Sequence, residues 1–177
     1  GTKMTNTFYS SLFFLSFVVV ALFEVLPNVN GNILDDICPG SFFPPLCFQM
    51  LQNDPAVSKG DAHGLLSTVL QIAQDNSTST YKWVKSIIKK PIKDPNLKAH
   101  MTNCLRSYND ATIYLKQSND FYKTGAYKNT SLYSSLAVFE SLSCNREFNE
   151  VPTELKPLSE AVQEFSNLSA RIADNLK

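Results

Sequence analysis

The sequence predicts an all-α fold: an antiparallel four-helix bundle preceded by an N-terminal helical hairpin, with two disulfides. Apolar residues recur at steps of three and four along four long segments, which is the spacing of amphipathic helices. The connections between these segments are short and contain proline or glycine, so successive helices are expected to run antiparallel. No segment of convincing length alternates apolar and polar residues as a strand does.

The hairpin is expected over residues 32–55. Two short helical pieces, 33–37 and 46–51, are joined through 42–45, where two aromatic residues are followed by two prolines. A hairpin this short cannot bury its own apolar side. It therefore either docks on the bundle or presents that side to another chain.

The bundle is expected over residues 56–177, and its first apolar stripe runs from Leu65 to Ile88. The stripe crosses a polar middle at 75–80, which predicts one long helix or two helices joined by a kink. The dipeptides 90–91 and 94–95 end in proline and bracket the next connection, because proline lacks a backbone donor and disfavours helix in the residue before it.

The second stripe runs from Leu97 to Tyr122 over roughly seven turns and ends at Gly125. The third offers Leu132, Leu136, Phe139 and Leu142 as its apolar positions, surrounded by small serines that let neighbouring backbones approach. The fourth has the cleanest helical period, from Leu155 to Leu176, interrupted only by Ser169. Pro152 and Pro157 mark its start, since proline is accepted in a first helical turn.

Four cysteines, Cys38, Cys47, Cys104 and Cys144, allow three disulfide pairings. If Cys104 opens the second helix and Cys144 closes the third, a turn at 124–125 leaves arms of about 30 Å each, so the two sulfurs meet. A shorter loop joins Cys38 to Cys47. This geometry favours 38–47 with 104–144 over the crossed pairings, and the alternative is four free buried thiols.

Residues 1–31 are interpreted as a secretory signal peptide, with residues 1–3 standing ahead of the first methionine. The apolar run 12–26 is too short for a bilayer-spanning helix, and cleavage is expected just after Gly31. An uncleaved anchor is the alternative. Asn76, Asn129 and Asn167 begin glycosylation sequons, as suits a secreted chain that is free of the membrane once the signal has been removed.

The composition argues against several function classes. Sixteen basic and sixteen acidic residues give zero formal charge, whereas nucleic-acid binders normally carry a basic excess. The two histidines, His63 and His100, stand on polar helical stretches, and no metal, phosphate-loop or nucleophile motif is present. The adjacent carboxylates Asp35 and Asp36 point about 100° apart on a helix and are expected to be solvated. We therefore expect neither catalysis nor a cofactor nor a metal.

A small-ligand or lipid carrier remains a second class to consider, because helical secreted domains can enclose an apolar cavity. Phe42, Phe43, Phe48 and Phe121 could line such a cavity, although filling the hairpin and bundle cores is the simpler role for them.

An ordered set of motifs resembles the plant invertase and pectin methylesterase inhibitor family over roughly residues 32–177. The set comprises Ile-Cys-Pro at 37–39, Pro-Leu-Cys-Phe at 45–48, Leu-Gln-Asn-Asp-Pro at 51–55, Lys-Gly-Asp at 59–61, Asp-Pro-Asn-Leu-Lys at 94–98, Gly-Ala-Tyr at 125–127 and Cys-Asn-Arg-Glu-Phe at 144–148. The resemblance implies a secreted, non-catalytic protein of the cell wall or apoplast. It also implies a one-to-one complex in which the substrate cleft of a carbohydrate-active enzyme is blocked.

The target enzyme is less directly indicated. Tobacco-type invertase inhibitors carry a Pro-Lys-Phe triplet where this chain has Gly-Ala-Tyr-Lys-Asn at 125–129, and the pattern is more similar to the kiwi-type pectin methylesterase inhibitor. The expected target is therefore pectin methylesterase, with cell-wall or vacuolar invertase as the alternative. Leu136 departs from the small residue that is common in the family.

Polar positions opposite the apolar stripes of the two disulfide-linked helices are expected to form the contact face. The candidate partner-binding residues are Arg106, Asp110, Tyr133, Ser141 and Asn145. Such a face could meet an enzyme without exposing a large apolar patch.

Overall fold

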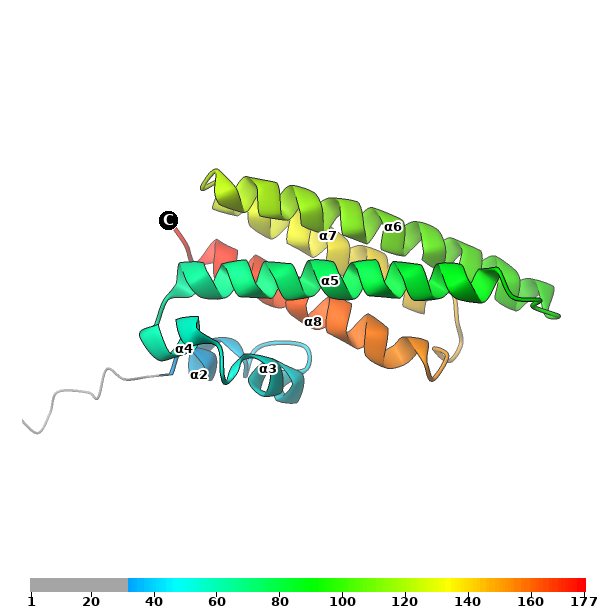
Figure 1. The fold of residues 1–177 in the computed structure, drawn as a ribbon, viewed down its shortest axis with the longest axis horizontal. Coiled ribbons are helices and arrows are strands. Elements are labelled where there is room, and N and C mark those ends of the chain that lie inside the picture. Colours follow the sequence, from blue (N-terminus) through cyan, green and yellow to red (C-terminus); the bar gives the residue numbers. More distant parts are fainter. Residues whose placement is uncertain (1–31) are drawn as a thin grey trace, which may run out of the picture. The chain divides into compact units, whose positions relative to one another are not determined.

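A computed structural model describes residues 32–177 (Figure 1). The expected signal peptide, 1–31, lies outside the described residues. Within them the only regular elements are helices: α2 Ile33–Ile37, α3 Pro44–Leu51, α4 Pro55–Lys59, α5 Ala62–Ile88, α6 Pro95–Lys123, α7 Tyr127–Asn145 and α8 Leu155–Asp174. The predicted all-α fold is confirmed.

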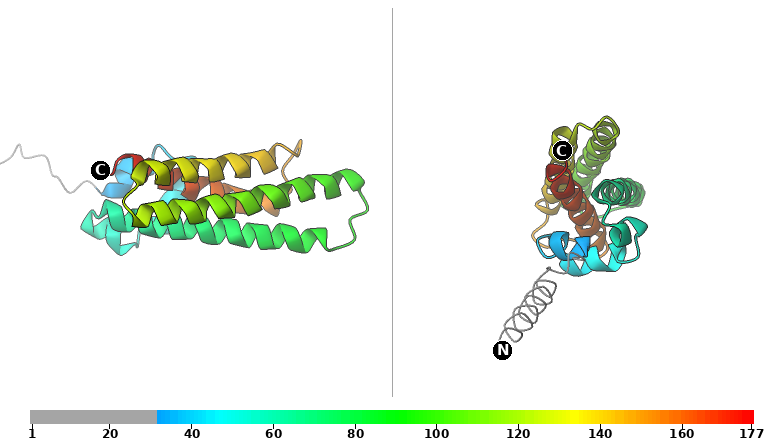
Figure 2. Two further views of the ribbon diagram at one scale, coloured as in Figure 1. Left: turned by 90° about the horizontal axis from the view of Figure 1, so that it is seen from above. Right: turned by 90° about the vertical axis from the view of Figure 1, so that its left-hand side faces the viewer.

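The four long helices form the bundle. Helix α5 packs on α6 and α8, and α7 packs on the same two helices from the other side, which closes the ring. Seen end-on in Figure 2, the short helices α2, α3 and α4 lie beside α5 and α8, away from α6 and α7. Helix α5 is continuous over 27 residues, so the alternative of two kinked helices is wrong.

Aspartates begin three of the helices. The side chains of Asp54, Asp61 and Asp94 accept hydrogen bonds from first-turn backbone N–H groups of α4, α5 and α6, at 2.7 to 2.9 Å. The 94–95 dipeptide thus starts α6 directly, with Asp94 as its cap and Pro95 as its first residue. Helix α4 was not predicted from the sequence. It has five residues and ends at Gly60, which lies in the left-handed region with φ 63°.

Both predicted disulfides are present, Cys38–Cys47 and Cys104–Cys144, and the described residues contain no free thiol. One detail of the expected geometry was wrong. Cys104 does not open its helix, because α6 already begins at Pro95. The two long arms still bring the sulfurs level, since the turn after Lys123 is tight and contains Gly125 with φ 72°.

Helix α7 is rotated relative to the sequence expectation. Leu132 and Phe139, two of its predicted apolar positions, are 54% and 53% exposed, while Leu136 and Leu142 are only partly covered. Its buried face consists instead of small and hydroxyl side chains: Thr130, Ser131, Ser134, Ala137, Val138, Ser141 and Cys144. The serines therefore face the bundle interior and the larger side chains face outward.

Hydrogen bonds satisfy the hydroxyl groups that this rotation buries. The Ser118 hydroxyl of α6 donates to the Thr130 carbonyl and lies 2.8 Å from the Ser134 hydroxyl. A second cluster joins Tyr108, Ser141 and Ser159 at 3.1 to 3.2 Å. Burial raises the pKa of the Tyr108 phenol, which therefore stays neutral as a hydrogen-bonding group. Buried hydroxyls with partners avoid the desolvation penalty of unpaired ones.

The N-terminal hairpin docks on α8 rather than remaining free for another chain. The carboxylate of buried Glu164 accepts a 2.7 Å hydrogen bond from the Phe43 backbone N–H, where α3 begins. The guanidinium of Arg171 donates to the Ile37 carbonyl at 2.8 Å, where α2 ends. The acidic Glu164 thus lies at the N-terminus of α3 and the basic Arg171 at the C-terminus of α2, which are the ends where the helix dipole favours each charge. Phe42 and Met50 remain exposed on the outer side of the hairpin.

The rotation of α7 predicts an unusual pair of mutational effects. We expect Ser134→Leu to lower the free energy of unfolding by about 1–3 kcal/mol, because it overpacks a full interior and breaks the contact with Ser118. Exposed Leu132→Gln should stay within about 0.5 kcal/mol of the parent. Urea unfolding followed by circular dichroism measures both. A stable Ser134→Leu variant beside a destabilised Leu132→Gln variant would contradict the orientation of α7.

Candidate protein-binding face

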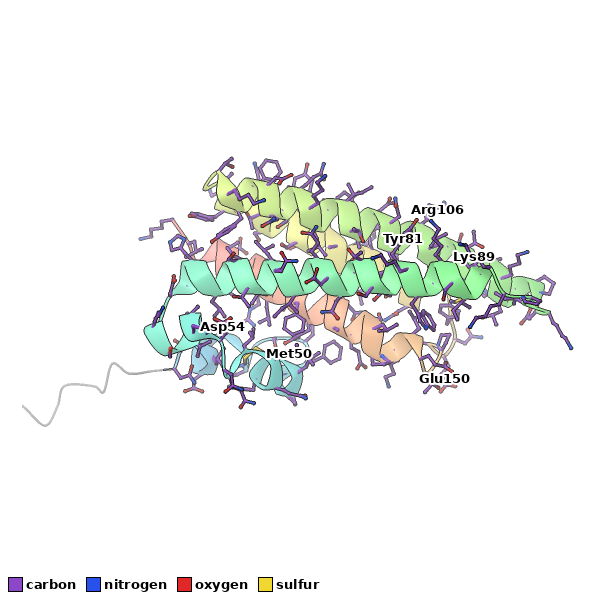
Figure 3. The ribbon with its side chains drawn as sticks, viewed as in Figure 1. Met50, Asp54, Tyr81, Lys89, Arg106 and Glu150 are labelled. Carbon is purple, nitrogen blue, oxygen red and sulfur yellow. A yellow bond between two sulfur atoms is a disulfide. The ribbon has the colours of Figure 1, made fainter. Side chains whose placement is uncertain are left out.

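Three of the five predicted partner-binding residues lie on one outward side of the bundle. Arg106 and Asp110 belong to α6 and Tyr133 belongs to α7. Arg106 is exposed, and Asp110 and Tyr133 are partly covered. Figure 3 labels Arg106 on this side and Met50 of α3 on the opposite side of the unit.

The other two residues lie elsewhere. Ser141 is fully buried and bonded to Tyr108 and Ser159, so it has no surface to offer a partner and the expectation for it was wrong. Asn145 ends α7 on the side of α8, where its side-chain oxygen Oδ1 accepts a 2.8 Å hydrogen bond from the Ser159 hydroxyl. The burial of Ser141 follows from the rotation of α7, whereas Asn145 is partly exposed and its candidate role stays a prediction.

The outward side is organised around a continuous line of side chains, which we call the α6–α7 seam. Its members are Asn103, Ser107, Asp110, Tyr114 and Phe121 from α6, Tyr133 and Glu140 from α7, and Glu147 just beyond α7. The α6 members recur mostly one turn apart, and Tyr133, Glu140 and Glu147 recur two turns apart. That spacing was visible in the sequence, but only a correctly oriented α7 shows which residues lie opposite one another.

Aromatic rings form the end of the seam next to the 124–126 turn. The Tyr133 ring lies between two rings of α6, with centroid distances of 5.1 Å to Phe121 and 6.1 Å to Tyr114. All three are partly covered, so each retains exposed surface. Aromatic side chains with an apolar body and a polar end are well suited to protein contacts.

Carboxylates form the centre of the seam. Partial burial raises the pKa of Glu140, a hydrogen bond from Ser107 opposes that effect, and the neighbouring charge of Asp110 adds to it. Two carboxyl groups facing each other across the helices make this part of the surface electronegative. It can attract a cationic side chain of a partner.

The end of the seam next to the Cys104–Cys144 disulfide is fixed by Glu147. Its carboxylate accepts a hydrogen bond from the Asn103 amide at 2.9 Å and lies 3.2 Å from His100 Nδ1. These hydrogen bonds hold the pKa of Glu147 below its usual value, and the one from Asn103 has the largest effect. The contact ties the start of the 146–154 connection to α6.

Exposed apolar side chains flank the seam on both helices. Ile113 of α6 is 47% exposed, and Leu132 and Phe139 lie along the outer side of α7. The Arg146 guanidinium lies over the Phe139 ring at 5.5 Å. A polar line with apolar side chains beside it has the composition of a non-obligate protein interface.

Residues 32–177 give little support for a metal site, a site built on the two histidines or a membrane-spanning helix. No group of three or more His, Cys, Asp or Glu within that range could hold a metal ion. His63 and His100 lie at different places, with His63 Nδ1 3.2 Å from the Tyr127 hydroxyl. No helix in the described range is long and apolar enough to cross a bilayer.

Two surface cavities are lined mainly by polar side chains, unlike the apolar cavity that a lipid carrier needs. One of about 500 Å³ lies between α5 and α6. The other, of about 390 Å³, lies between the α7–α8 connection, α8 and Phe43. Of the four phenylalanines considered for a carrier, only Phe43 lines either cavity.

Comparison with known proteins agrees with this architecture. The family model described as plant invertase/pectin methylesterase inhibitor matches residues 32–176. The chain is 31% identical to a pectinesterase inhibitor of Actinidia deliciosa over 161 residues, 86% of each protein. It is 24% identical to a cell wall / vacuolar inhibitor of fructosidase from Arabidopsis thaliana, over 94% of this chain and 98% of that protein.

Solved structures show the same fold. A mutant form of an Arabidopsis pectin methylesterase inhibitor matches with a TM-score of 0.74 at 21% identity, covering 81% of this chain and 97% of that one. A second Arabidopsis pectin methylesterase inhibitor matches with a TM-score of 0.64.

The fold is thus a disulfide-linked four-helix bundle with an N-terminal hairpin docked on α8. This chain belongs to the plant invertase/pectin methylesterase inhibitor family. The resemblance seen in the motifs is thereby confirmed. Membership in a family of enzyme inhibitors also confirms the expectation of a protein that is not itself an enzyme.

The two shifted carboxylates predict opposite dependences of stability on pH. The folded-state pKa of Glu140 lies above its ordinary 4.5, so its ionisation costs stability as the pH rises through that folded-state value. The folded-state pKa of Glu147 lies below 4.5, so its contribution is present above 4.5 and is lost as the pH falls through the folded-state value. We expect Glu140→Gln to stabilise, and Glu147→Gln to destabilise, at about pH 7, with both differences shrinking on acidification. Urea unfolding at several pH values measures the two signs, and shifts of the same sign would contradict the assignment.

Proposed function

We propose that this protein is a secreted inhibitor of pectin methylesterase, which binds the enzyme one-to-one and covers its substrate cleft with the α6–α7 seam. The observation that carries the proposal is the seam itself: an exposed polar and aromatic line with flanking Ile113, Leu132 and Phe139, on a family member that resembles a pectinesterase inhibitor. Action at the cell wall or apoplast is part of the proposal, as is the expected N-terminal signal.

The position of the hairpin supports the choice of face. Helices α2 and α3 cover α8 and are anchored there by Glu164 and Arg171. The outward sides of α6 and α7 have no such cover from the described residues. A long, nearly straight face built from two helices can lie along an open cleft shaped for a polymer, making many modest contacts without a protruding loop.

The turn between α6 and α7 supports pectin methylesterase over invertase. The stretch that lacks a Pro-Lys-Phe triplet is 125–129, and its last three residues, Tyr127, Lys128 and Asn129, form the first turn of α7. Gly125 closes the preceding turn tightly. A stretch wound into a helix has no loop to insert into a small sucrose pocket. Invertase remains the second candidate because of the fructosidase inhibitor from Arabidopsis thaliana among the relatives.

Titration of one preparation against both enzymes tests the target. We expect methanol release from pectin by a plant pectin methylesterase to fall to zero at a one-to-one ratio, in the nanomolar to micromolar range. Sucrose hydrolysis by cell-wall and vacuolar invertases should be unchanged. Inhibition of an invertase alone would show that the alternative target is the correct one, and tight lipid binding without inhibition of either enzyme would favour a carrier.

The same assay tests the face. Asp110→Lys combined with Tyr133→Ala should weaken inhibition of pectin methylesterase by at least about tenfold, since it reverses a charge and removes an aromatic contact at the seam. Asp75→Lys makes the same charge change on the exposed side of α5 and serves as the matched control. Circular dichroism confirms that all variants fold. If Asp75→Lys weakens inhibition and the seam variant does not, the enzyme binds another face.

A further inference from the structure

The three glycosylation sequons occupy very different surroundings in the folded chain. Asn76 lies in the middle of α5, Asn129 in the first turn of α7 and Asn167 within α8. We infer that Asn129 carries the N-linked glycan of the folded protein and that Asn76 and Asn167 stay bare. This inference depends on entry into the secretory pathway, which is part of the proposed function.

A glycan at Asn167 would be crowded by the packing of α8. Its neighbours Ser166 and Leu168 are fully buried, and its own side-chain oxygen is buried without a hydrogen-bond partner. The hydroxyl of Ser169, which completes the sequon, is buried and donates to the Phe165 carbonyl at 2.8 Å. Asn167 itself is only partly exposed, so a sugar chain attached here would crowd the closely packed side chains on either side of it.

The side chain of Asn76 is engaged in a hydrogen bond within its own helix. Its side-chain nitrogen, the atom that would carry a sugar, donates a 2.8 Å hydrogen bond to the Ile72 carbonyl. Ile72 lies one turn earlier on the same side of α5 and lines the cavity between α5 and α6. Ser77 and Thr80 beside it are fully buried. A glycan on Asn76 would therefore start in the groove between two bundle helices.

Asn129 has the surroundings that a glycan needs. It is exposed, and its side chain makes no hydrogen bond within the described part of the chain. It lies at the end of α7, next to the 124–126 turn, so a sugar chain can extend away from the bundle. Ser131, which completes the sequon, is a small side chain on the buried face of α7, so its replacement by Ala or Thr changes the side-chain volume little.

A glycan on Asn129 would also border the proposed contact face. Leu132 and Tyr133 lie one turn further along α7, so the first sugars stand at the aromatic end of the seam. The carboxylate centre and the Glu147 end lie several turns away and remain open.

Site mapping of the secreted protein tests the inference. The full chain is expressed in yeast behind a host secretory leader, so that entry into the pathway does not depend on its own N-terminal segment. Enzymatic glycan release in heavy-oxygen water converts each glycosylated asparagine to labelled aspartate. Peptide mass spectrometry of the folded, monomeric fraction should find label at residue 129 and none at 76 or 167. Label at 76 or 167, or no label at 129, would overturn the inference.

Matched variants provide a second readout on gels. Ser131→Ala should abolish the mobility shift caused by the glycan, and Ser131→Thr, which keeps the sequon, should retain it. Thr78→Ala and Ser169→Ala remove the other two sequons and should leave the shift unchanged. A shift that survives Ser131→Ala and disappears in either of the others would contradict the assignment. Because no target enzyme enters these assays, their failure is distinct from failure of the proposed function.

Discussion

The close approach of α6 and α7 is the constraint on which the rest of the structure depends. The Cys104–Cys144 disulfide brings the two Cα atoms to 4.5 Å, and the buried side chains of α7 nearest to it, Ser141 and Ala137, are small. Serine, threonine and alanine fill that interface, and the hydroxyls pair across it. Because small residues must face inward, the larger side chains of α7 face outward. The composition of the exposed face is thus a consequence of packing on the opposite side of the same helix.

Helix α8 has the complementary role. It buries the strongest apolar stripe in the chain and also carries Glu164 and Arg171, which hold the ends of α3 and α2. The hairpin is therefore held by charged hydrogen bonds to backbone as well as by its disulfide and apolar contacts. This arrangement commits one side of the bundle to internal packing. The outward sides of α6 and α7 stay available for a partner.

Much of the fold could be predicted because long helices with short connections leave a strong periodic signal. The stripe of α8, the proline and glycine punctuation and the cysteine spacing led to the correct architecture and disulfides. The orientation of α7 could not be predicted, because the usual assumption that larger apolar residues face inward fails when a disulfide imposes close packing. Its apolar and hydroxyl faces are nearly opposite, so the same error placed Ser141 on the surface. Arg106, Asp110 and Tyr133 were correctly placed on the outward side, since two of them belong to α6, whose stripe follows the rule.

The central claim is that α7 turns its larger side chains outward to form, with α6, the surface that meets the enzyme. Hydroxyl-radical footprinting of the free protein and of its complex with pectin methylesterase tests this most directly. Leu132, Phe139 and Tyr133 should be oxidised readily in the free protein and protected in the complex, while exposed Phe42 and Met50 on the hairpin react equally in both. Unreactive Leu132 and Phe139 in the free protein, or protection confined to Phe42 and Met50 in the complex, would contradict it.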